Sequence, residues 1–112
     1  MANVATTASS SGRFIIISSP QAVHPSAENA AYATAKAAAD AWTLALADSL
    51  SDTAATANII AVNAILTDTM RRENPDKAFA TFTPTEDIAA AIAFICSPHA
   101  SQMNGRRLPL HP

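Results

Sequence analysis

A tyrosine and a lysine spaced four residues apart are the side chains of this 112-residue chain best placed to do chemistry. In Tyr32-Ala33-Thr34-Ala35-Lys36, both would lie on one face of a helix. A free tyrosine has a pKa of about 10, too high for efficient proton transfer near neutrality, and a lysine ammonium one helical turn away favours the phenolate. Ser18-Ser19 ends an apolar run, and Ser19 precedes the tyrosine by thirteen residues. A serine hydroxyl there can hold the oxygen atom that exchanges the proton.

The same residues also have a purely structural interpretation. Tyr32 can be a partly buried helical tyrosine along which Lys36 extends its aliphatic stem. His24 is interpreted as an ordinary loop histidine, and Asp68 and Glu73 as solvated loop charges. The Tyr-x-x-x-Lys spacing arises often by chance. The choice between the chemical and the structural interpretation therefore depends on the surrounding elements.

Three segments favour strands. Arg13–Ser18 is a continuous β-branched and aromatic run, typical of a strand buried on both faces of a parallel sheet. Residues 57–62 form a second such run, and residues 106–110 a short third strand. Pro109 in the third strand lacks an N–H group, which predicts a place at the sheet edge.

Two segments favour helices. Residues 30–50 are rich in alanine and leucine, with Asn29 or Ser26 as the N-cap. Residues 84–97 follow a helix-start pattern, in which Thr83 and Glu86 form a capping box and proline takes the first helical position. The order strand, helix, strand, helix, strand predicts an α/β fold with parallel strands and right-handed crossovers.

The remaining segments lack a regular period. Residues 1–12 are small and polar and are expected to form a flexible leader. Residues 67–82 are expected to be irregular, with Pro75 among scattered charges.

Composition excludes several classes of function. The net charge of −2, with no basic stripe, argues against nucleic acid as a partner. The lone Cys96 excludes an internal disulfide and a cysteine metal cluster, and is expected to be a buried, inert thiol. His99 and His111 show no metal-ligand spacing. No apolar run has the length of a membrane span and no signal peptide is apparent, so we expect a cytoplasmic protein without a membrane partner.

In this order of elements, Ser19, Tyr32 and Lys36 resemble the Ser…Tyr-x-x-x-Lys site of the short-chain dehydrogenases/reductases. Asn58 and Thr67 fall in the register of that family's next strand, and the tail from Thr83 is similar to its last helix and strand. The resemblance covers residues 13–111 and implies that 13–112 form the C-terminal half of a Rossmann-like domain.

The resemblance also implies a function and a set of roles. It implies an oxidoreductase that interconverts a small-molecule carbonyl and alcohol with NAD or NADP. Tyr32 would be the acid/base, and Ser19 would bind the substrate oxygen. Lys36 would lower the pKa of Tyr32 and bind the ribose of the cofactor. Ile65 and Thr67 would join Tyr32 and Lys36 in binding the cofactor.

Two departures from the family pattern qualify this expectation. The family's Pro-Gly pair, whose glycine lets backbone approach the nicotinamide, is replaced by Val62-Asn63. The chain also has only two glycines, Gly12 and Gly105, so the Gly-rich dinucleotide turn of the family's N-terminal half is absent. The sequence therefore indicates a truncated enzyme, either active or inactive on its own, and the alternative is a non-catalytic remnant or interaction module.

The same departure predicts an assembly. Without a neighbouring strand, Phe14-Ile15-Ile16-Ile17 would form an apolar sheet edge. We therefore expect a homo-oligomer or a pairing with a companion N-terminal half. The family commonly dimerises through the helix that corresponds to residues 30–50.

Overall fold

The computed structural model describes residues 11–112, so nearly all of the expected leader lies outside the described residues. Its main sheet has three parallel strands in the order β1-β2-β5. Their bounds are Arg13–Ser18 for β1, Thr56–Ala61 for β2 and Arg107–Pro109 for β5. The α/β class and all three predicted strands are thereby confirmed. The central strand β2 is buried along its whole length, and β5 with Pro109 lies at an edge, as predicted.

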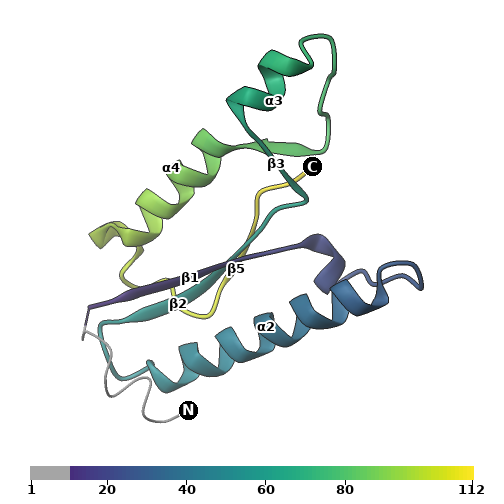
Figure 1. Ribbon diagram of the computed structural model, residues 1–112. Coiled ribbons are helices and arrows are strands. Elements are labelled where there is room, and N and C mark those ends of the chain that lie inside the picture. The colour runs from purple at the N-terminus through teal and green to yellow at the C-terminus, as the bar shows by residue number, and fades with distance from the viewer. Residues whose placement is uncertain (1–10) are drawn as a thin grey trace.

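The two long helices cover opposite faces of this sheet (Figure 1). They are α2 (Ala30–Ser49) and α4 (Thr85–Cys96), close to the predicted 30–50 and 84–97. Successive side chains of a strand point to opposite faces, so β2 supplies both cores. Ala57 packs with Leu46, Ala47 and Leu50 on the α2 side, and Ile60 belongs to a second cluster with residues of α4.

Strand β1 forms the other edge of the sheet. Phe14 and Ile17 are 36% and 37% exposed, so the expectation of burial on both faces is wrong for them. No strand in the described part of the chain pairs with the outer side of β1. Phe14 instead meets the ring of Trp42 on α2 edge to face, with 5.6 Å between ring centroids. The apolar edge predicted for an unpartnered strand is therefore present.

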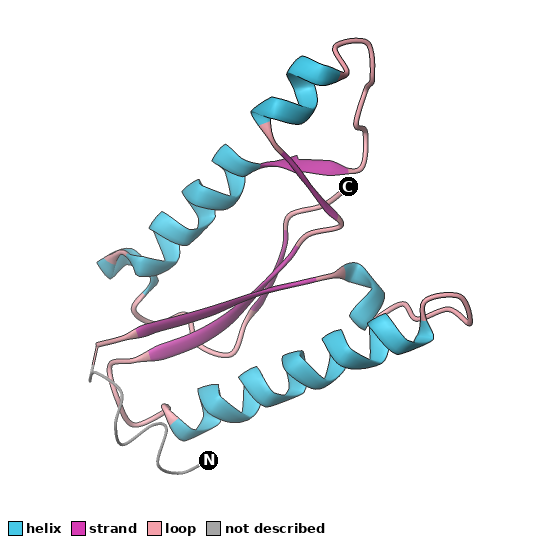
Figure 2. Cartoon of the chain, in the orientation of Figure 1, coloured by secondary structure: helices cyan, strands magenta, loops and turns pink. Residues whose placement is uncertain are grey.

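A small lobe replaces the irregular segment expected at 67–82. Strand β3 (Ala64–Leu66) pairs in parallel with β4 (Phe82–Pro84), and α3 (Asp68–Glu73) lies between them in sequence. Figure 2 shows this lobe extending beyond the three-stranded sheet. The Thr67 hydroxyl caps α3 by accepting a hydrogen bond from the Met70 amide. Residues 67–73 thus carry local helix signals that the sequence interpretation missed.

Helix α4 begins differently from the prediction. Thr83 lies in β4, and its hydroxyl donates to the carbonyl of Leu110 instead of capping the helix. Pro84 takes the N-cap position without a side-chain cap, and α4 starts at Thr85. The capping box is therefore wrong, because Thr83 is drawn into a contact with the C-terminal segment.

Two other local expectations have mixed outcomes. Asn29 does occupy the N-cap of α2, but its Oδ1 accepts from the Ser26 amide and not from the helix. Cys96 is exposed, contrary to the expected buried thiol. The buried face of α4 ends at Ile95, and the next residue is turned away from the sheet by the helical rotation. Two short 3₁₀ turns, η1 (Pro20–Ala22) and η2 (Pro98–Ala100), complete the chain.

Candidate active site

Ser19 lies in the turn that leads from β1 into η1. It is the N-cap of η1, accepting a hydrogen bond from the Gln21 amide at 3.2 Å and donating its hydroxyl to Oε1 of the same residue. Ser19 is fully buried, and its carbonyl accepts from the Ala22 amide at 3.1 Å. A bound molecule would reach the Ser19 hydroxyl by displacing the Gln21 side chain.

Tyr32 and Lys36 lie one turn apart on α2, on a shared face as predicted. The Lys36 ammonium lies 5.7 Å from the centroid of the Tyr32 ring and donates a hydrogen bond to the carbonyl of Ile17 at 3.3 Å. Half of the Tyr32 surface is exposed, which leaves its phenol open to a ligand. Helix α2 also packs against η1, so the Ser19 turn lies against the helix that carries this pair.

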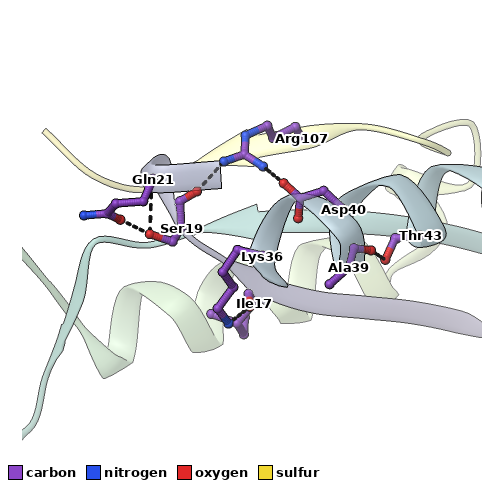
Figure 3. A network of polar contacts seen from close by, with 8 residues as sticks. All are labelled: Ile17, Ser19, Gln21, Lys36, Ala39, Asp40, Thr43 and Arg107. Carbon is purple, nitrogen blue, oxygen red and sulfur yellow. Dashed lines mark hydrogen bonds and ion pairs between the residues drawn. The ribbon is translucent and has the colours of Figure 1, made fainter. Parts of the chain in front are cut away.

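A partly buried ion pair adjoins the Ser19 turn (Figure 3). Arg107 on β5 pairs with the carboxylate of Asp40 on α2, and its Nη2 donates to the carbonyl of Ser19 at 2.7 Å. Sequence reasoning missed both residues. The available signal was the position of Asp40 four residues after Lys36, which continues the Tyr32–Lys36 stripe of the helix.

Ile65 and Thr67 follow the carboxyl end of β2. The ends of β1 and β2 lie together, with the Val62 amide donating to the Ser18 carbonyl at 2.9 Å. Ile65 is 43% exposed in β3, and the Thr67 hydroxyl caps α3. Within residues 11–112, no hydrogen bond joins these two residues to Ser19, Tyr32 or Lys36. The structure therefore places Ser19 at the start of η1 and Tyr32 and Lys36 on α2, the helix that packs against η1, and it places Ile65 and Thr67 at the base of the lobe.

Other candidate sites are not supported. His24 is exposed in the loop before α2. Among residues 11–112, no group of three or more histidine, cysteine, aspartate or glutamate side chains could hold a metal ion. In the same part of the chain, none of the helices is long and apolar enough to cross a bilayer.

Comparison with known proteins places this geometry in a family. The model of the family described as enoyl-(acyl carrier protein) reductase matches residues 1–110. The chain belongs to this family, within the short-chain dehydrogenases/reductases. No curated protein matches the sequence.

Many solved structures share the fold. A short-chain dehydrogenase from Burkholderia cenocepacia, in complex with NADP, is 29% identical over 89% of this chain and 44% of its own, with a TM-score of 0.71. Acetoin dehydrogenase from Salmonella typhimurium is 32% identical over 88% of this chain and 40% of its own, with a TM-score of 0.72. A blue fluorescent protein from a metagenomic library, in complex with NADPH, is 26% identical over 94% and 46%, with a TM-score of 0.74. The chain spans less than half the length of each.

Proposed function

We propose that this chain supplies the proton-transfer residues of an NAD(P)-dependent oxidoreductase that interconverts a carbonyl and an alcohol. The observation that carries the proposal is the placement of the Lys36 ammonium, which lies over the Tyr32 ring and donates to the carbonyl of Ile17 in β1, two residues before Ser19. Family membership and the NADP and NADPH complexes of two relatives support the cofactor class.

Each residue has a role that follows from its position. When bound, the nicotinamide cofactor supplies or accepts a hydride at the carbonyl carbon. Tyr32 donates its phenolic proton to the carbonyl oxygen during reduction and takes it back during oxidation. The Lys36 ammonium stabilises the phenolate left after that transfer, because opposite charges attract over this distance. The Ser19 hydroxyl, once released by Gln21, donates to the same substrate oxygen and orients it.

The residues present fit one end of the cofactor. The Lys36 ammonium can bind ribose hydroxyls, and the exposed surface of Ile65 and the hydroxyl of Thr67 suit the nicotinamide end. Neither glycine of the chain lies in a strand-to-helix turn, since Gly12 precedes β1 and Gly105 precedes β5. We therefore assign only the nicotinamide ribose end to these residues, and the pyrophosphate and adenosine would bind to another segment.

A second candidate function is a non-catalytic interaction module. Four large apolar side chains of β1 and α2 are at least one-third exposed, which favours a surface that binds a protein partner. They are Phe14, Ile17, Trp42 and Leu44.

Cofactor titration separates the two candidates. The 112-residue chain is titrated with NADH and NADPH by fluorescence, and turnover is followed with small ketones and with an α,β-unsaturated thioester. The oxidoreductase proposal predicts saturable cofactor binding below millimolar concentration, through the nicotinamide ribose end, together with ketone reduction. Tyr32→Phe should lower kcat by about 100-fold or more, because it removes the hydroxyl that gives and takes the proton.

The matched control is Thr34→Ala, an exposed change between Tyr32 and Lys36 that should leave kcat and cofactor binding unchanged. Reduction of the thioester but not of any ketone would contradict the carbonyl/alcohol chemistry. Absence of cofactor binding up to millimolar concentration would contradict the enzyme and favour the interaction module.

A further inference from the structure

The guanidinium of Arg107 joins three elements that are far apart in the sequence. Through Nη2 it donates to the carbonyl of Ser19 in the turn after β1, and through Nη1 it pairs with Asp40 on α2. Arg107 itself belongs to β5. Figure 3 shows the guanidinium lying between the Ser19 carbonyl and the Asp40 carboxylate. A single planar group therefore connects the Ser19 turn to the helix of Tyr32 and Lys36.

Helix α2 holds the Ser19 turn at a second point as well. Lys36 bonds the Ile17 carbonyl, two residues before Ser19. Asp40 is one turn after Lys36 and two turns after Tyr32, so all three residues share a stripe of the helix. Two connections therefore hold the backbone around Ser19 to this face of α2. Lys36 donates to it directly, and Arg107 connects it to Asp40.

Stability alone is a poor explanation of this ion pair. Asp40 is 8% exposed, and among the described residues its Oδ1 has no hydrogen-bond partner. The Arg107 side chain is 25% exposed, so the pair is only partly buried. Partial removal of two charges from water costs about as much as their attraction returns, so the pair adds little net stability. A guanidinium does, however, fix the directions of two acceptors at once, which a lysine ammonium does not.

We propose that Arg107 and Asp40 are positioning residues that hold Ser19 at its working distance from Tyr32 and Lys36. This inference rests on the proposed oxidoreductase function. A displacement of about 1 Å in such a site can cost about 100-fold in rate. The pair would therefore affect the reaction without touching the substrate or the cofactor.

The kinetic test compares neighbouring arginines. Arg107→Met should lower kcat by about 100-fold and leave the KM and the NADPH dissociation constant within about threefold. Arg107→Lys should recover little, because an ammonium cannot bridge both acceptors. Arg106→Met, an exposed change at the adjacent position, should leave kcat unchanged. An Arg107→Met enzyme with unchanged kcat would overturn the proposal.

A double variant distinguishes positioning from stability. Arg107→Met with Asp40→Leu removes both charges of the partly buried pair, so its urea midpoint should stay near that of the parent. Its kcat should nevertheless remain low. Recovery of kcat by the double variant would overturn the positioning role, because only the unpaired Asp40 charge would then have been harmful.

Amide exchange gives a readout that does not need activity. The Ala22 N–H shares the Ser19 carbonyl with Arg107, so in the double variant it should exchange at least about tenfold faster, with little change at Ile60 in the sheet core. If the parent turns over no substrate, the proposed function fails and this exchange comparison still decides whether Arg107 holds the turn. Equal Ala22 exchange in parent and double variant would overturn that claim.

Discussion

Asn58 is a fully buried amide that aligns the start of β5 with β2. Its Oδ1 accepts from the Arg106 amide at 2.9 Å, and its Nδ2 donates to the Met103 carbonyl at 2.8 Å. These two bonds set the register in which Arg107 enters the sheet opposite Ile59. The position of the guanidinium at the Ser19 turn therefore depends on an amide whose own hydrogen bonds go to Met103 and Arg106.

We predict that Asn58→Ala lowers the free energy of unfolding by about 3 kcal/mol, because two buried backbone groups lose their partners. Urea denaturation followed by circular dichroism measures the change. The control is Asn74→Ala, which removes a single exposed side-chain bond to the Met70 carbonyl and should cost about 0.5 kcal/mol or less. Equal losses in the two variants would contradict the prediction.

Some residues of the candidate site can be predicted from their spacing in the sequence, and others cannot. Tyr32 and Lys36 are four residues apart, so helical spacing alone places them on one face. Arg107 and Asp40 are 67 residues apart, and only the completed sheet brings them together. Sequence analysis did not find this pair, because no periodic pattern indicates a contact between residues so far apart in the sequence. The exposure of Cys96 was not predicted, because the apolar residues before it do not indicate which positions of α4 face the sheet. Ile95 is buried and Cys96, one residue later, is exposed.

The junction of β4 and α4 is held by a tertiary bond. Thr83 is buried and donates to the Leu110 carbonyl, which ties β4 to the segment after β5. Glu86 is exposed and pairs with Arg71 of α3 at 3.5 Å. The two residues of the expected capping box therefore serve different neighbours.

Substitutions at these two residues should have unequal effects. We predict that Thr83→Val lowers the free energy of unfolding by about 1–2 kcal/mol, since a buried carbonyl loses its donor at nearly constant volume. Glu86→Ala should cost less than about 0.5 kcal/mol, because an exposed ion pair contributes little. Thermal unfolding of both variants checks the difference. A larger loss for Glu86→Ala would instead support the capping box.

Element length explains most of what could be predicted of the fold, and the three-residue strand β5 is the exception. The strands β1 and β2 and the helices α2 and α4 are long enough to show a run or a period, and all four match their predictions closely. The lobe strands β3 and β4 have three residues each, too few to show alternation, and α3 has six. The lobe was missed for that reason, although Thr67 followed by Asp68 is a helix-start pattern.

Within residues 11–112, strand β1 is the edge of the three-stranded sheet that carries exposed large apolar side chains. Strand β1 presents Phe14 and Ile17, whereas the opposite edge, β5, is only three residues long and contains a proline. Long apolar edges promote pairing with another chain, and short edges with proline resist it. Association is therefore expected on the β1 side.

We predict that the chain self-associates with rising concentration and that Ile17→Lys suppresses this association, because an edge lysine disfavours strand pairing. Sedimentation velocity over a concentration series measures it. The control is Ile65→Lys, which changes a similarly exposed isoleucine of the lobe and should leave association unchanged. A parent that stays monomeric throughout the series would contradict the prediction.

The bond between Arg107 and Ser19 also bears on the timing of synthesis. Arg107 lies 88 residues after Ser19 in the sequence. A ribosome therefore makes Ser19, Tyr32 and Lys36 long before it makes Arg107, which donates to the Ser19 carbonyl. Contacts of such separation form late, because the chain entropy of closing the loop opposes them. On the nascent chain Ser19, Tyr32 and Lys36 lack this link until β5 emerges, so their arrangement is completed only after β5 has been made.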